Sequence, residues 1–336
     1  MVKVAINGFG RIGRLTFRAL LESGRKDIEV VAINDLATPE ANAMLLEYDT
    51  VHRKLPFPVK IEGDKLVVGG QSPKMLAIKD PTTLPWKDLG VDIVFECTGI
   101  FTDKEKALVH LTAGAKRVLV SAPSKGADLT VVYGVNHTKL TSEHLVVSNA
   151  SCTTNCLAPV VYVLNEAFGI SHGYMTTIHS YTGDQRTVDT FHKDPYRARA
   201  AACNIIPTST GAAKAIGEVV PELKGKLDGA STRVPTMDVS LVDFKFVAKK
   251  NVTEEEVNAA IVAASKTPRF KGILEVNDKP LVSSDYIHNP ASSTFDLNET
   301  KVIEGNFVRV VSWYDNEWGF SNRMCDTAVA LAATIK

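Results

Sequence analysis

A cysteine placed between a strand and a helix has the clearest chemical potential in this chain. Cys152 follows an apolar strand-like run, 145–148, and a helix-compatible stretch, 157–168, begins shortly after it. At a helix N-terminus a thiol faces unpaired backbone N–H groups and the positive end of the helix dipole, and both favour the thiolate. A thiolate is a nucleophile for carbonyl carbon. The alternative is a structural cysteine, since free cysteines often pack as small apolar residues.

A histidine is a common partner of a catalytic thiol, because it can take the thiol proton and later return it. Among the eight histidines, His179 has the most informative position. It follows a strand-like stretch, 174–178, and opens a polar, irregular segment that reaches Pro207. A loop of that length in a compact domain is usually functional. The sequence alone does not bring His179 to Cys152, and a surface or packed histidine is the alternative.

A dinucleotide-binding pattern opens the chain. A short apolar strand, 2–6, leads into G-x-G-x-x-G at Gly8, Gly10 and Gly13, and a helical pattern follows. In that setting the glycines permit a tight turn, close approach of a pyrophosphate and close packing of helix on strand. A second strand, 28–34, ends at Asp35, where a carboxylate accepts hydrogen bonds from an adenosine ribose and repels a 2′-phosphate. The alternative is an ordinary strand–helix turn with a surface aspartate.

Strand and helix patterns predict the elements that must position these groups. Apolar strands at 91–97 and 116–121 continue the alternation with helices, and ligands bind at the carboxyl ends of such parallel strands. Cys152 follows the next strand end, so we expect the thiol and a nicotinamide to share one substrate. In the second half strands outnumber helices: 239–249 alternates as a long strand, and a capping box at Thr253 starts a helix.

These patterns predict an α/β fold with two domains. Residues 1–150, with a C-terminal helix within 317–336, are expected to form a Rossmann-type domain with a parallel sheet. Residues 151–316 are expected to form an α+β catalytic domain with a mostly antiparallel sheet. The amphipathic pattern of 321–335 suggests that the last helix packs back on the first domain.

Composition argues against several classes of protein. The 38 basic and 38 acidic residues cancel and form no charged block, which gives no support to a nucleic-acid or membrane partner. No apolar run approaches bilayer length, and the apolar start of the chain is too short for a signal peptide. Five scattered cysteines favour a reduced, cytoplasmic protein. Cys152 and Cys156 have no second Cys/His pair at ligand spacing, so no metal site is expected.

Four motifs are spread along the chain. They are residues 6–14 (INGFGRIGR), 148–156 (SNASCTTNC), 177–182 (TIHSYT) and 313–319 (WYDNEWG). Together they resemble the phosphorylating glyceraldehyde-3-phosphate dehydrogenases, and the resemblance covers essentially the whole chain without a large insertion. It implies an NAD-dependent enzyme that converts glyceraldehyde 3-phosphate and inorganic phosphate to 1,3-bisphosphoglycerate, in glycolysis or gluconeogenesis.

The resemblance also implies roles for individual residues. Cys152 would form a thiohemiacetal and then a thioester, with its N–H as a candidate oxyanion donor, and His179 would act as base. NAD would be held by the glycine motif and by Arg11, Ile12, Asp35, Lys79, Ser121 and, at the nicotinamide, Asn316. One phosphate would be held by Thr182 and Arg233, the other by Ser151, Thr153, Thr210 and Gly211, with Arg197 within reach of both. The segment 208–213 also reads independently as a helix N-terminus, which supports a phosphate there.

Two departures from the family pattern lie in the long loop. Thr190-Phe191 stands where NAD-specific members commonly carry Leu-Pro, which helps to exclude NADP. Asp35 retains the other selectivity device, so we expect a preference for NAD with some use of NADP. Pro195-Tyr196 replaces the common Leu-Arg before Arg197, which bears on how Arg197 is presented. The resemblance further implies a homotetramer in which this loop reaches a neighbour's cofactor site.

Three alternatives remain beside this interpretation. Erythrose-4-phosphate dehydrogenase shares the nucleophile motif but hydrolyses its thioester, and the segment 208–211 argues against it because that relative lacks this phosphate-binding loop. A non-catalytic NAD-binding regulator predicts loss of Cys152 or His179, and both are present. A cysteine hydrolase leaves the dinucleotide motif unexplained.

Overall fold

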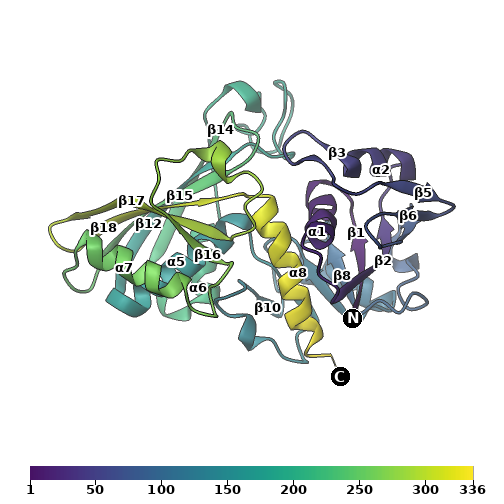
Figure 1. Cartoon of the computed structure of the whole chain (residues 1–336), viewed down its shortest axis with the longest axis horizontal. Coiled ribbons are helices and arrows are strands. Elements are labelled where there is room, and N and C mark those ends of the chain that lie inside the picture. Colours follow the sequence, from purple (N-terminus) through teal and green to yellow (C-terminus); the bar gives the residue numbers. More distant parts are fainter. Residues whose placement is uncertain (336) are drawn as a thin grey trace. The chain divides into compact units, whose positions relative to one another are not determined.

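The computed structural model describes residues 1–335, which fall into two compact units. The first unit contains Met1–Ser151 and the described residues from Ser321 onward, and the second contains Cys152–Phe320. Each unit is built on a sheet of its own (Figure 1). No helix within residues 1–335 is long and apolar enough to cross a membrane.

The sheet of the first unit is parallel at its centre. Its strand order is β10-β11-β9-β8-β1-β2-β7-β6-β5. β1 pairs in parallel with β2 on one side and with β8 on the other, so the strand order reverses beside β1. In open parallel sheets a ligand crevice lies at such a point, outside the carboxyl ends of the strands. The strands are β1 (Val2–Asn7), β2 (Ile28–Asn34), β5 (Lys60–Glu62), β6 (Lys65–Val67), β7 (Lys74–Leu76), β8 (Ile93–Glu96), β9 (Arg117–Val120), β10 (Leu129–Thr130) and β11 (Val146–Ser148).

Burial explains why these segments form central strands. All four residues of β8 and the last four of β1 are buried, as expected for apolar runs covered on both faces of a parallel sheet. The strand predicted at 28–34 matches β2 residue for residue. The helical elements of this unit are α1 (Arg11–Glu22), α2 (Pro39–Glu47), η1 (Pro81–Thr83), α3 (Lys104–Ala107), α4 (Val109–Thr112) and η2 (His137–Lys139), and a short hairpin joins β3 (Tyr48–Asp49) to β4 (Arg53–Lys54).

The last helix, α8 (Trp318–Ala332), starts in the second unit and continues in the first. Its later turns are tied to the first unit by polar contacts. The Thr327 hydroxyl donates to Asn149 Oδ1 at 2.8 Å, and Asp326 pairs with Arg25 at 3.0 Å.

The second unit has a mostly antiparallel sheet, ordered β13-β14-β12-β15-β18-β17-β16. Helices α5, α6 and α7 pack on it, and Figure 1 shows them along one face. Strand β15 alternates buried and part-exposed residues along its whole length, so the alternation predicted for 239–249 is confirmed. The capping box predicted at Thr253 is also present. The elements are α5 (Cys152–Phe168), β12 (Ile170–Ser180), η3 (Ala201–Cys203), β13 (Ile206–Thr208), α6 (Ala212–Val219), η4 (Pro221–Leu223), β14 (Leu227–Val234), β15 (Ser240–Ala248), α7 (Glu254–Ser265), β16 (Leu274–Asn277), η5 (Ser283–Tyr286), β17 (Ser293–Ile303) and β18 (Phe307–Tyr314).

Two element boundaries differ from the sequence-based expectation, and both matter for the site. Helix α5 begins at Cys152 itself, because 153–156 continue as buried helix instead of forming a turn before residue 157. Strand β12 extends through Ser180, so His179 lies within a strand and does not open the loop. Eight residue pairs join β12 to β14, which fixes the position of His179 beside Arg233.

Candidate active site

The glycine-rich turn of the first unit is shaped for close approach of a ligand. Gly8 has φ +91°, and a Cβ atom there would lie 2.7 Å from the backbone N of Thr98. A Cβ on Gly13 would lie 2.1 Å from the Gly8 carbonyl oxygen. The N-cap residue of α1 is Gly10, which has no side chain to cap the helix start. The turn therefore requires glycine at Gly8 and Gly13 and fits a bound pyrophosphate.

A pocket lies beside this turn within the first unit. Asp35 is on its wall with both carboxylate oxygens held, one by the Phe9 N–H at 2.7 Å and the other by the Ala37 N–H at 2.9 Å. The lining residues are Asn7, Gly8, Gly10, Asn34, Asp35, Leu36, Ile78, Lys79, Pro81, Cys97, Thr98, Ile100 and Phe101. Apolar side chains at Leu36, Ile100 and Phe101 can cover an adenine ring, and the Asp35 carboxylate can receive a ribose hydroxyl.

The other sequence-predicted cofactor residues are placed differently. Arg11 does not line this pocket but pairs with the buried Asp49 at 2.5 Å. Ser121 follows β9 and donates its N–H to the Glu96 carbonyl at 3.0 Å. Ile12 lies in the first turn of α1. Asn316 belongs to the second unit, where its Oδ1 accepts hydrogen bonds from the hydroxyls of Ser180 at 2.9 Å and Ser240 at 2.8 Å. Those two hydroxyls orient the Asn316 amide.

The second unit brings the two predicted catalytic side chains together. Cys152 is the first residue of α5, and its Sγ lies 3.5 Å from Nε2 of His179, near the end of β12. The predicted contact between Cys152 and His179 is therefore present in the structure. His179 is buried, with 4% of its surface exposed, whereas Cys152 is partly exposed.

Hydrogen bonds on the far side of His179 indicate its tautomer. Nδ1 lies 2.7 Å from the Ser180 carbonyl oxygen, which can only accept. The Arg233 guanidinium donates to the same oxygen at 2.9 Å. The same guanidinium nitrogen, Arg233 Nη1, also lies 3.0 Å from His179 Nδ1, a longer contact than the one between Nδ1 and the carbonyl. The 2.7 Å contact requires a proton on Nδ1, because the carbonyl oxygen has none to donate, so the Nε2 lone pair faces the thiol. His179 is thus oriented to receive a proton from Cys152.

Burial sets the charge of this pair. It raises the pKa of the Cys152 thiol, against the lowering effects of Arg233 and of hydrogen bonds at Thr153 and the helix start. Burial, reinforced by Arg233, lowers the pKa of His179 to about 3. The helix start acts in the direction expected from the sequence, since its N–H groups lower the pKa of the thiol, but desolvation acts against it and is the larger effect. Burial thus favours the uncharged form of both side chains.

A tyrosine that the sequence analysis did not single out supports the pair. Tyr314 is buried, and its hydroxyl lies 2.8 Å from Thr153 Oγ1 and 2.9 Å from Thr177 Oγ1. Its ring meets the His179 ring edge-on at 6.0 Å. Tyr314 therefore connects the first turn of α5 to β12. Its position inside the motif 313–319 was the signal that could have pointed to it.

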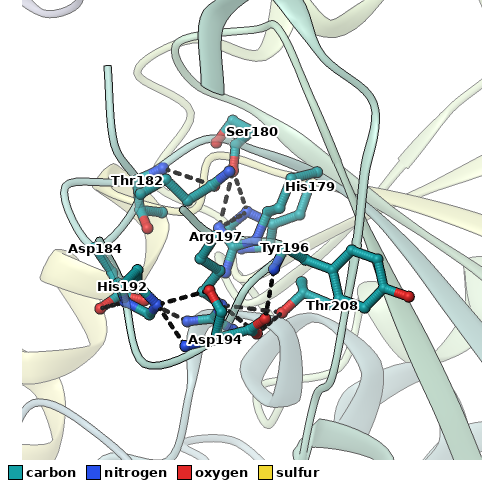
Figure 2. Close-up of polar contacts among 11 residues, drawn as sticks. His179, Ser180, Thr182, Asp184, His192, Asp194, Tyr196, Arg197 and Thr208 are labelled. Atoms are coloured by element: carbon teal, nitrogen blue, oxygen red, sulfur yellow. Dashed lines mark hydrogen bonds and ion pairs between the residues drawn. The ribbon is translucent and has the colours of Figure 1, made fainter. Parts of the chain in front are cut away.

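The predicted anion-binding residues lie around the long loop of the second unit. Figure 2 shows His179, Ser180 and Thr182 above a cluster formed by Asp184, His192, Asp194, Arg197 and Thr208. Gly211 is the N-cap residue of α6, and the hydroxyl of the preceding Thr210 accepts the Ala212 N–H at 3.2 Å. The helix start predicted within 208–213 is confirmed. Ser151 is the last residue of the continuous part of the first unit.

Arg197 is already paired with acidic side chains. It makes a short ion pair with Asp184, its Nε donates to Thr208 Oγ1 at 2.9 Å, and Asp194 lies 3.6 Å away. His192 Nε2 lies 3.5 Å from Asp184. An anion that binds Arg197 must therefore compete with carboxylates for the same guanidinium.

The departures at 190–191 and 195–196 lie on the surface of this loop. Phe191 is 84% exposed, and Tyr196 is 60% exposed. Thr190 donates its N–H to the Ala198 carbonyl at 3.0 Å, which holds the loop closed on itself.

A Rossmann-type unit and a thiol–imidazole pair define the class: a dinucleotide-binding protein with a candidate nucleophile. Comparison with known families identifies it further. Residues 2–104 match the NAD binding domain of glyceraldehyde 3-phosphate dehydrogenase, and residues 151–316 match the C-terminal domain. The chain belongs to the glyceraldehyde 3-phosphate dehydrogenase family.

Named relatives agree over almost the full length of the chain. The glyceraldehyde-3-phosphate dehydrogenase of Xanthobacter flavus is 67% identical over 330 residues, 98% of each chain. That of Cereibacter sphaeroides is 64% identical over 98% of each chain. That of Geobacillus stearothermophilus is 56% identical over 99% of this chain and 98% of its own.

Proposed function

We propose that the chain oxidises glyceraldehyde 3-phosphate with NAD⁺ and inorganic phosphate to 1,3-bisphosphoglycerate. The observation that carries the proposal is the 3.5 Å distance between Cys152 Sγ, at the start of α5, and His179 Nε2. The first unit of the same chain contains the glycine-rich turn at Gly8 and Gly13. The named relatives carry the same activity in their names. No observation favours the erythrose 4-phosphate alternative.

Cys152 would attack the aldehyde carbon and form a C–S bond. Its proton passes to His179 Nε2 and from there to the developing alkoxide, which gives a thiohemiacetal. The first backbone N–H groups of α5 stabilise charge on that oxygen. NAD⁺ supplies the hydride acceptor that this oxidation needs. His179 removes the hydroxyl proton during oxidation, and a thioester of Cys152 results.

The acyl group would then be transferred to phosphate. A phosphate oxygen attacks the thioester carbon, the C–S bond breaks, and the Cys152 sulfur leaves as thiolate. One phosphate group is assigned to Thr182 and Arg233. The other is assigned to Ser151, Thr153, Thr210 and Gly211. Hydroxyls, a helix N-terminus and guanidinium groups are suitable donors for these anions. The covalent route conserves the oxidation energy in an acyl group that phosphate can capture.

NAD is the expected cofactor form. The glycine-rich turn requires glycine at Gly8 and Gly13, because Cβ atoms there would clash with the backbone of Thr98 and Gly8, and Asp35 offers its carboxylate to a ribose. A 2′-phosphate there would meet like charge, which disfavours NADP. Because Thr190-Phe191 stands in place of the common Leu-Pro, Asp35 is the principal residue that discriminates NAD from NADP.

Phosphate dependence tests the proposed reaction directly. We expect NADH formation from glyceraldehyde 3-phosphate and NAD⁺ to require inorganic phosphate beyond the first turnover, because the thioester waits for that acceptor. Initial rates at 340 nm, with and without phosphate, provide the measurement. Steady turnover that ignores phosphate would indicate a hydrolytic aldehyde dehydrogenase and would contradict the assignment of Thr210 and Gly211.

Asp184 should weaken phosphate binding by holding Arg197. We expect Asp184→Asn to lower the KM for phosphate by about three- to ten-fold at low salt, because it removes one carboxylate competitor. Asp189→Asn is the matched control, since Asp189 lies in the same loop but pairs with Arg199. A higher KM in the Asp184 variant would show instead that this carboxylate holds Arg197 in its binding orientation.

We also infer that the chain assembles as a homotetramer. Tyr174, Ile303 and Phe307 are large, exposed side chains that line one groove on the sheet of the second unit. Apolar surface gathered in this way usually marks a contact with another chain, and the family resemblance implies a homotetramer. Sedimentation velocity of the purified chain measures the assembly.

A cytoplasmic location fits the five unpaired cysteines.

A further inference from the structure

A buried carboxylate lies beneath the dinucleotide pocket and does not line it. Glu96 is the last residue of β8, is 1% exposed and accepts hydrogen bonds from four donors. Its Oε1 accepts the Thr98 N–H at 2.8 Å and a short bond from the Thr98 hydroxyl. Its Oε2 accepts from Asn7 Nδ2 at 2.7 Å and from His110 Nε2 at 2.8 Å. Four converging donors match the four lone-pair sites of an ionised carboxylate.

The indole of Trp86 sets the tautomer of His110. Trp86 Nε1 lies 3.2 Å from His110 Nδ1, and an indole N–H can only donate. His110 Nδ1 must therefore accept, so a neutral ring carries its proton on Nε2 and donates it to Glu96. Trp86 and His110 are each 0% exposed. The hydrogen bonds from Trp86 to His110 and from His110 to Glu96 therefore lie inside the first unit, away from solvent.

On its other side Glu96 reaches the pocket wall through two routes. Asn7 accepts from Asn34 Nδ2 at 2.8 Å, and Asn34 Oδ1 accepts the Ile78 N–H at 2.8 Å. Thr98 Oγ1 accepts the Ile100 N–H at 3.0 Å. All five of these residues line the pocket: Asn7, Asn34, Ile78, Thr98 and Ile100. The network thus joins the carboxyl ends of β1, β2 and β8.

The position of Thr98 is critical for the glycine turn. The Thr98 backbone N would lie 2.7 Å from a Cβ on Gly8, so these two backbone segments are in close contact. Without the two bonds to Glu96, the segment after β8 would lose the contacts that hold it in this position. His110 adds a further contact, because its ring meets Phe101 edge-on at 6.0 Å.

We propose that Glu96 is a positioning residue for the dinucleotide pocket, and that His110 and Trp86 hold its carboxylate for that purpose. The proposal rests on NAD binding by the first unit as described under the proposed function. It assigns an effect on cofactor affinity to residues that do not line the cofactor pocket.

A matched pair of variants at His110 tests the proposal. His110→Leu removes the donor to Glu96, whereas His110→Gln keeps an amide N–H that can reach the carboxylate, and both remove the ring. We expect the NAD⁺ dissociation constant, measured by titration calorimetry, to rise about five-fold or more in the leucine variant. In the glutamine variant it should stay within about two-fold of wild type. The kcat at saturating NAD⁺ should change little in either variant, because the thiol and imidazole lie in the second unit.

Three outcomes would overturn the proposal. If folded His110→Leu binds NAD⁺ with an unchanged dissociation constant, Glu96 has no positioning role. If NAD⁺ binding weakens equally in the leucine and glutamine variants, the effect comes from packing of the His110 ring against Phe101. If His110→Leu fails to fold, Trp86→Phe takes its place, because it frees the tautomer but keeps the His110 ring. We expect the dissociation constant of that variant to rise at least about two-fold, and an unchanged value refutes the proposal. A wild-type chain that binds no NAD⁺ would refute the proposed function itself.

Discussion

Replacing Cys152 with serine should reduce kcat by about 10⁴-fold or more. The serine hydroxyl is a far weaker nucleophile than a thiol, and the burial that raises the pKa of Cys152 would also disfavour a serine alkoxide. NAD⁺ affinity should be unaffected, since the pocket that contains Asp35 is lined by residues of the first unit alone. Initial rates of NADH formation and calorimetric titration with NAD⁺ separate the two effects.

Cys156→Ser is the matched control for this variant. Cys156 lies one turn further along α5 and is buried, with Sγ 3.5 Å from Ser293 Oγ. A serine there keeps a hydroxyl partner, so we expect kcat to remain within about two-fold of wild type. If the Cys152 variant kept more than a hundredth of the activity, covalent catalysis by this thiol would be excluded.

Local pattern was sufficient to predict most of the framework. The apolar runs of the first half could be read as strands because a parallel sheet is buried on both faces, and β2 was found with its correct bounds. The period-two alternation of β15 and the capping box at Thr253 are equally local signals. Each depends only on neighbours within a few residues, which is the information that a single sequence carries.

Contacts between distant segments could not be predicted in that way. The approach of Cys152 to His179 depends on β12 lying beside α5, and the Tyr314 hydroxyl meets Thr153 across 161 positions of sequence. Only the family resemblance connected the first pair, and nothing local pointed to Glu96. The effect of burial on the pKa of the thiol could not be predicted for a related reason: the helix terminus is visible in the sequence, but the degree of burial is a property of the folded unit.

His179→Asn should lower kcat by about 10²- to 10⁴-fold with little change in NAD⁺ affinity. Asparagine can keep the hydrogen bond to the Ser180 carbonyl that Nδ1 makes at 2.7 Å, but it has no counterpart of Nε2 to take the thiol proton. Alkylation of Cys152 by iodoacetamide, followed by mass spectrometry of the labelled peptide, should slow in parallel. Turnover within about three-fold of wild type would rule out His179 as the base.

Stability against pH provides an independent check on the same variant. The folded pKa of His179 is about 3, below its ordinary value of 6.5, so between these values the unfolded chain binds a proton that the folded chain does not. The unfolding free energy of the wild type therefore falls as the pH falls from 6.5 towards 3. The asparagine variant has no imidazole at this position and does not show that fall. Relative to wild type, His179→Asn should gain about 2 kcal/mol of unfolding free energy between pH 7.5 and pH 5. Denaturant unfolding at the two pH values measures this gain, and its absence would mean that His179 titrates normally and is not the buried neutral base inferred here.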